Sequence, residues 1–459
     1  MAANQRWAIV GGGMMGLSLA HQLTQDGQSV SIIEASHNLG GLADAWQVGD
    51  ITWDRHYHVI LLSDSHLREF LEQIGLQDEF RWVETKTGFF TGGRFYSMSN
   101  TAEFLMFPPL NLIQKFRLGG TIFLASKIKN WRRMESVLVE KWLTRWSGKT
   151  TFQKMWLPLL RAKLGDAYQR TSAAFIWAYI SRMYKARRTG LKKEMFGYIH
   201  GGYARIIQRL EELFSERNVA IHKNSPVAKI QANDPNEVEI QLVDGSTHTF
   251  DKVIMTTSTA VVDQVCPDLQ PEERRTFADI EYLGIVCASV VLNRPLNGYY
   301  VTNITDDVPF TAVIEMTTIV QPSELNGHTL VYLPKYVTAD DPIVRMSDEQ
   351  IQTLFLDALR RMYPDLTDEQ IVAFKVSRVR DVMALPTLDY SQHLPPIELS
   401  VPNVYAINSA HIVKGNLNVN ETIEIAKDAY SKYISPVIRS QKQNVCHGES
   451  LDQPEVSRK

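Results

Sequence analysis

His56, Tyr57 and His58 are the residues whose types and spacing best suit acid–base chemistry in this chain. An imidazole titrates near neutral pH, so a histidine can take up or return a proton during a reaction. If residues 51–60 form a strand, His56 and His58 share one face and Tyr57 points the opposite way. The alternative is that these side chains are only buried hydrogen-bonding groups. We therefore treat the three as candidate catalytic residues and leave that alternative open.

A glycine-rich turn near the start of the chain indicates what these side chains would act beside. Residues 7–10 are apolar and predict a buried strand, and a helical pattern of leucines follows the turn. The turn has the spacing G-x-G-x-x-G. Its first glycine, Gly11, allows a sharp turn, Gly13 lets the backbone approach a pyrophosphate, and Gly16 lets the helix pack tightly on the strand. The helix N-terminus would then face the anion. The residues of this predicted dinucleotide site are Gly11, Gly13, Met14, Met15 and Gly16.

Two further features favour FAD over NAD as the dinucleotide. A second predicted strand ends in Glu34, 18 residues after Gly16, where an acid can accept hydrogen bonds from ribose hydroxyls. Gly40, Gly41 and Leu42 follow, and a second diglycine suits a chain that passes close under a longer cofactor. Here the sequence resembles the flavoprotein superfamily of amine oxidases, protoporphyrinogen oxidases and phytoene-type desaturases, and more remotely UDP-galactopyranose mutases. The resemblance implies noncovalently bound FAD.

The resemblance also implies later contacts with the cofactor. Val227 would pair its backbone with the adenine ring, although a merely buried strand valine is the alternative. Asn408 and Ser409 replace the family's Gly-Asp, so a ribityl contact by Ser409 would use a neutral side chain. Asn418 is predicted to cap a helix whose first amide, at Val419, would face the reduced flavin, with an ordinary capped surface helix as the alternative.

The same resemblance predicts an α/β protein in which a Rossmann-like FAD-binding domain is interleaved with an α+β substrate domain. The 459 residues are too many for one compact core, which agrees with two lobes. The FAD-binding domain would comprise residues 1–60, 196–265 and 400–435. The substrate domain would comprise residues 61–195, mainly helical with a hairpin at 87–96, and 270–395, with a strand at 284–292. Residues 436–459 are polar and predict a disordered tail.

Positive charge is concentrated between residues 111 and 193. This stretch holds 19 Lys and Arg against three acidic residues, a net charge of +16 in a chain whose net charge is −3. It could attract a phosphorylated or carboxylated substrate or an acidic membrane surface, or could simply be a solvated face. Residues 104–110 and 116–133 combine apolar and basic side chains, as a monotopic membrane contact would. Arg132 and Arg133 are the candidate anion-binding residues.

Composition argues against several other classes of protein. No run reaches the roughly 18 apolar residues of a membrane span, and a strand that begins by residue 7 leaves no room for a signal peptide. We therefore expect a cytoplasmic protein, with membrane association left open. Cys266, Cys287 and Cys446 lack metal-type spacing, so we expect reduced thiols and no metal site. No nucleic-acid-binding module is recognisable, and we expect no nucleic-acid partner.

These observations predict an FAD-dependent oxidoreductase of the desaturase or oxidase type. Hydride would pass from a C–H or C–N unit of a small, partly apolar substrate to flavin N5, and a lipid-like or a phosphorylated substrate both remain open. No lysine lies between Phe277 and Leu292, where amine oxidases commonly carry one, which disfavours that subgroup. The alternatives are a mutase-like flavoenzyme that acts on a nucleotide sugar and a flavin-holding protein that mainly binds a membrane or a partner.

Overall fold

A five-stranded parallel sheet forms the centre of one lobe in the computed structural model, which describes residues 5–185, 194–413 and 417–448. The strand order is β10-β2-β1-β14-β20, and all neighbours run parallel. Parallel sheets are covered on both faces, so their strands are apolar throughout. The strands are β1 (Arg6–Val10), β2 (Ser29–Ile33), β10 (Ala220–His222), β14 (Lys252–Met255) and β20 (Val404–Ala406).

The apolar run of β1 serves both faces of this sheet. Trp7 and Ile9 pack with the helices on one face, whereas Ala8 and Val10 pack with the layer on the other. The first layer contains α1 (Met14–Gln25), α2 (Ser65–Gln73), α10 (Gly202–Glu216) and α14 (Val419–Ala429). The second contains an antiparallel sheet of β11 (Val227–Asp234), β12 (Glu237–Leu242) and β13 (Thr247–Phe250), with α11 (Thr259–Val265) and α12 (Pro271–Ala278).

A seven-stranded sheet is the core of the second lobe, in the order β19-β15-β18-β17-β16-β7-β8. The predicted hairpin is confirmed as β7 (Thr87–Thr91) and β8 (Arg94–Ser97), and the strand predicted at 284–292 is β15 (Tyr282–Leu292). Because β7 pairs with β16, chain segments about 200 residues apart share one sheet. The remaining strands are β16 (Val301–Ile304), β17 (Ala312–Glu315), β18 (Thr329–Val337) and β19 (Ile371–Ala384), and α13 (Asp348–Met362) packs beside them.

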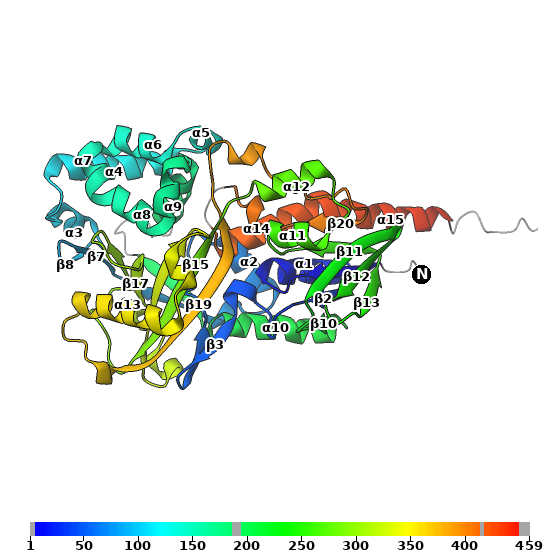
Figure 1. Ribbon diagram of the computed structural model, residues 1–459, viewed down its shortest axis with the longest axis horizontal. Helices are drawn as coiled ribbons and strands as arrows, with labels where there is room; N and C mark the ends of the chain where they lie inside the picture. Colours follow the sequence, from blue (N-terminus) through cyan, green and yellow to red (C-terminus); the bar gives the residue numbers. More distant parts are fainter. Residues whose placement is uncertain (1–4, 186–193, 414–416, 449–459) are drawn as a thin grey trace, which may run out of the picture.

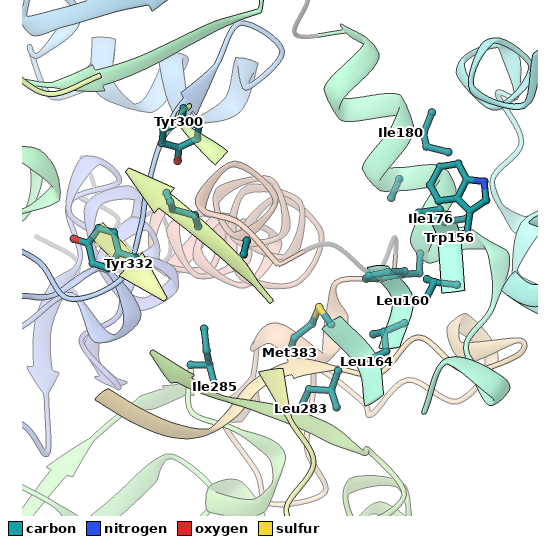
Figure 2. Close-up of a cluster of buried hydrophobic side chains, with 14 of the residues drawn as sticks. Trp156, Leu160, Leu164, Ile176, Ile180, Leu283, Ile285, Tyr300, Tyr332 and Met383 are labelled. Atoms are coloured by element: carbon teal, nitrogen blue, oxygen red, sulfur yellow. The ribbon is translucent and has the colours of Figure 1, made fainter. Parts of the chain in front are cut away.

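A group of helices lies at the end of the molecule opposite the parallel sheet (Figure 1). Leu160 and Leu164 of α8 (Leu157–Leu164) lie toward the seven-stranded sheet near Leu283 and Met383 (Figure 2). Trp156, which ends the π-helical turn before α8, lies beside Ile176 of α9 (Ala173–Lys185). The group contains α3 (Thr101–Met106), α4 (Leu112–Lys127), α5 (Arg132–Glu135), α6 (Val139–Ser147), α7 (Lys149–Thr151), α8 (Leu157–Leu164) and α9 (Ala173–Lys185). Small sheets of β3 (Ala45–Val48) with β4 (Ile51–Asp54), and of β5 (Ile60–Leu61), β9 (Met195–Ile199) and β6 (Phe80–Glu84), complete the fold.

The end of the chain differs from the predicted disordered tail. Helix α15 (Ser435–Gly448) continues from the π-helical turn Tyr430–Ile434 that follows α14. Its start packs on the fold, because Ile434 and Ile438 are buried in the same apolar cluster as α1 and α14. Residues 449–459 lie outside the described residues. None of the helices in the described parts of the chain has the length and apolar character needed to cross a membrane.

Candidate active site

The two glycine motifs predicted to hold the cofactor touch each other. The amide of Gly40 donates to the carbonyl oxygen of Gly12 at 2.8 Å, and Gly13 and Gly40 form an isolated parallel bridge. A Cβ on Gly16 would lie 2.0 Å from the Gly11 carbonyl oxygen, so only glycine fits there. A Cβ on Gly13, in contrast, would meet no protein atom closer than 4.0 Å. The space beside Gly13 is therefore left open toward the cavity, as a pyrophosphate requires.

Glu34 lies against this turn at the carboxyl end of β2. Its Oε2 accepts a hydrogen bond from the amide of Gly12 at 2.6 Å, and its Oε1 accepts one from the amide of Ser36 at 2.8 Å. The side chain also lines the cavity. The Glu34 carboxylate thus holds the glycine turn and also faces the cavity. Its contact with a ribose stays a prediction.

A cavity of about 590 Å³ extends from the glycine turns into the second lobe. The Asn418 side chain caps α14 by accepting from the Glu421 amide at 3.1 Å, which confirms the predicted N-cap. Predicted cofactor residues on the wall are Gly11, Gly13, Met14, Met15, Glu34, Gly40, Gly41, Leu42, Ser409, Asn418 and Val419. Thr256, Thr257 and Ser258 also line it, and the sequence signal for them was their place directly after a strand of the parallel sheet.

Val227 is not among the described residues that line the cavity, and its adenine contact stays a prediction. It begins β11, two residues after Ser225, whose amide donates to the Glu34 carbonyl oxygen at 2.9 Å. The segment therefore starts beside the end of β2. Residues 414–416, part of the predicted approach to α14, lie outside the described residues.

The segment that carries His56, Tyr57 and His58 is not the strand considered above. Strand β4 ends at Asp54, whose Oδ1 accepts from the Tyr203 amide in the first turn of α10 at 2.9 Å. The chain then runs without regular structure to β5, so the alternation of a strand does not apply. All three side chains consequently line the cavity.

Burial disfavours the charged form of both histidines. His56 Nδ1 lies 3.1 Å from the Leu42 carbonyl oxygen, and its Nε2 lies 3.2 Å from Ser377 Oγ, so each nitrogen has a partner. Burial lowers the pKa of His56 to about 4 and that of His58 to about 3. Such rings are weak bases at neutral pH. These features favour the hydrogen-bonding alternative for His56, and the catalytic assignment remains a prediction.

The far end of the cavity is largely apolar and carries two tyrosines in contact. The hydroxyls of Tyr57 and Tyr336 are 3.0 Å apart. Lys163 and Arg182 also reach the wall, and Arg182 is paired with Asp64 through contacts of 3.1 and 2.8 Å. Sequence reasoning missed Tyr336, Lys163 and Arg182 because no local pattern links them to the glycine turns. The apolar wall includes Trp156, Leu159, Leu160, Phe175, Ile176 and Met183.

The structure does not bring Arg132 and Arg133 to this cavity. Both are exposed on α5, and the Arg132 guanidinium lies 5.1 Å from the centre of the Trp131 ring. Arg132 lines a separate surface cavity with Glu135 and Lys432. A role for these arginines in anion binding therefore concerns the surface and not the wall beside the glycine turns.

Comparison with known proteins identifies the family. The sequence pattern of flavin-containing amine oxidoreductases matches residues 14–412. The chain belongs to this family. Its members bind FAD, and the glycine turns, Glu34 and the cavity fit that cofactor. The α/β fold, FAD as cofactor and an FAD-dependent oxidoreductase, as predicted from the sequence, are confirmed.

Individual relatives in this family are distant. The chain is 22% identical to the zeta-carotene desaturase of Synechocystis sp. over 433 residues, which cover 82% of this chain and 86% of the desaturase. It is 24% identical to the L-amino-acid oxidase of Sistrurus catenatus edwardsii over 294 residues, 61% of this chain and 56% of that enzyme. Reduced UDP-galactopyranose mutase superposes with a TM-score of 0.73 at 14% identity, over 96% of this chain and 98% of that chain. This last similarity shows the fold alone.

Proposed function

We propose that this oxidoreductase oxidises a small, partly apolar molecule in the manner of a desaturase or an oxidase. The supporting observation is the single continuous cavity that joins the glycine turns to the apolar wall of the second lobe. FAD, when bound, supplies the acceptor for a hydride that leaves a C–H or C–N unit, and oxygen, a quinone or another acceptor would reoxidise it.

The residues of the chain would bind the cofactor, orient the substrate beside it and exclude water from the cavity. Gly13, Gly41 and the N-terminus of α14 would hold the cofactor, since they line the cavity and present backbone rather than bulky side chains. Burial raises the pKa of the Cys266 thiol to about 12, and Cys287 is also fully buried. Neither thiol reaches the cavity wall, which supports noncovalent attachment.

The test is the fate of the flavin under anaerobic conditions. We expect purified protein to release intact FAD on denaturation, and its absorption to bleach when partly apolar candidate substrates are added without oxygen. A reaction that needs prior flavin reduction but consumes no reductant would instead favour the mutase-like alternative. Flavin that no substrate bleaches would favour a protein that mainly binds a partner.

We also propose that the enzyme docks on acidic membrane surfaces through α3 and α4. Ile113 and Phe116 are one helical turn apart on α4 and are 71% and 74% exposed, although its opposite face packs Leu118 and Ala125 in the core. Isolated exposed apolar residues are ordinary, but a contiguous group marks an interaction surface. The exposed apolar residues of α3 and α4, here called the α3–α4 patch, are Leu105, Met106, Leu112, Ile113, Phe116, Phe123 and Leu124.

The charge around the α3–α4 patch suits anionic lipid. Glu135 is buried and only Glu140 and Asp166 add exposed negative charge between residues 111 and 185. The exposed cations of this stretch include Arg117, Lys127, Lys129, Arg132, Arg133, Arg145 and Lys149. Co-sedimentation with phosphatidylserine vesicles, but not with phosphatidylcholine vesicles, is the expected result. Equal recovery in the supernatant with both lipids would contradict docking.

A further inference from the structure

Lys163 is a cation on the cavity wall that lies outside the motifs predicted to hold the cofactor. It lies in the last turn of α8, and its Nζ is 4.6 Å from the centre of the Tyr336 ring and 6.0 Å from that of Tyr179. Among the described residues no carboxylate lies within 4.0 Å of this nitrogen. The other cation on the wall, Arg182, is neutralised by Asp64. Lys163 therefore presents an uncompensated positive charge.

Two contacts fix the elements that surround Lys163. The Thr311 hydroxyl donates to the carbonyl oxygen of Ala162 at 2.7 Å and so ties α8 to the seven-stranded sheet. The ring beside the lysine is fixed as well, because the Tyr336 hydroxyl meets that of Tyr57. Aromatic rings attract a cation but do not neutralise it. The ammonium thus stays available to an anion inside the cavity.

A series of contacts separates Lys163 from the residues predicted to hold FAD. Leu42 follows the diglycine, and its carbonyl oxygen contacts His56. The next residue, Tyr57, contacts Tyr336 through its hydroxyl, and Lys163 lies over the Tyr336 ring. Lys163 thus contacts the tyrosine pair and not the glycine turn at Gly13, and we assign it to the substrate side of that pair.

The acids on the same wall already have partners of their own. Glu34 accepts from two backbone amides at the glycine turn, and Asp381 Oδ2 accepts from Ser258 Oγ at 2.8 Å. The cavity wall formed by the same helix is apolar at Leu159 and Leu160, and Trp156 of the preceding π-helical turn extends it. The environment suits a molecule with an apolar body and one acidic end.

We infer that Lys163 binds an acidic group of the substrate, so that the molecule oxidised is an amphipathic acid with a carboxylate or phosphate at one end. The inference rests on the proposed function for the identity of the reaction, but not for the binding itself. Lys163 here is a specificity-determining residue that selects the substrate by its charge.

The test compares acidic and neutral ligands of one chain length. Decanoate, decyl phosphate and decanamide are titrated into FAD-loaded protein, and binding is followed by the visible absorption of the flavin and by tryptophan fluorescence. Lys163→Met keeps the length of the side chain but removes its charge. We expect it to weaken binding of the preferred acid by about 10- to 150-fold, as for loss of a charge-assisted hydrogen bond, and to leave decanamide binding nearly unchanged.

The matched variants separate charge from folding. Lys163→Arg should retain most of the affinity for the acid, and Lys141→Met, at an exposed site on α6, should behave as the native protein. Preference for decanoate or for decyl phosphate identifies the acidic group. Equal binding of acid and amide by the native protein, no binding of either acid, or an unchanged acid affinity in Lys163→Met would overturn the inference. A protein without FAD would contradict the proposed function, while fluorescence still reports the role of Lys163.

Discussion

Replacing Ile113 and Phe116 together with serine tests membrane docking most directly. Both side chains project from the outer face of α4, so the change removes apolar surface without opening a cavity in the core. The inner face of the helix, with Leu118 and Ala125, is left intact. The fold and the FAD content should therefore be preserved, and only the affinity for vesicles should fall.

The size of the effect follows from the exposed fractions of the two side chains. Complete burial of an isoleucine or phenylalanine is worth about 1.5–3 kcal/mol. With 71% and 74% of their surfaces available, insertion of each contributes about 1–2 kcal/mol. The double variant should therefore lose about 2–4 kcal/mol of binding free energy, or about 30- to 700-fold in partition coefficient.

Vesicle co-sedimentation across a lipid titration measures this loss, with FAD absorbance as the control for folding. Leu354→Ser/Val372→Ser is the matched control, because these residues are also partly exposed but lie on α13 and β19, away from α4. Binding should fall with rising salt, since charges are screened over about 8 Å at 0.15 M and about 3 Å at 1 M. If the α4 variant and the control lose affinity equally, the reasoning from exposed area is wrong.

Three more predictions concern the cofactor, the buried histidines and the basic surface. Glu34→Ala should weaken FAD retention by about 10- to 150-fold, because it removes charge-assisted hydrogen bonds worth about 1.5–3 kcal/mol. Equilibrium dialysis measures the affinity for FAD, and an unchanged affinity would mean that the ribose does not contact Glu34. Burial lowers the pKa of His56 from 6.5 to about 4, so the unfolded chain takes up a proton more readily than the folded one. The free energy of unfolding should therefore fall as pH drops from about 6.5 towards 4, and urea titrations of His56→Gln should show a smaller fall; an identical pH dependence would mean that the ring is not buried as a neutral group. Arg132→Gln/Arg133→Gln should weaken vesicle binding by about 1 kcal/mol per charge and leave the FAD content intact. If vesicle binding changed neither with these substitutions nor with salt, the basic surface would be a solvated face without a binding role.

The sequence alone was sufficient where function depends on backbone geometry within a short segment. Gly11, Gly13 and Gly16 carry their meaning in their spacing, because a tight turn between a strand and a helix tolerates few other residues. The cap at Asn418 was predictable for the same local reason, since a side-chain oxygen and the backbone three residues later define it.

Only the tertiary structure decided which distant side chains meet. Nothing local links Tyr57 with Tyr336 or directs Lys163 into the cavity, because these contacts depend on how the helices pack against the seven-stranded sheet. The pattern of residues 51–60 does not reveal that β4 ends at Asp54, because Asp54 contacts the first turn of α10, far away in sequence. The burial of Ile438 on α15 and the exposure of Phe116 likewise depend on which neighbour covers each apolar side chain, and periodicity in the sequence does not specify that neighbour.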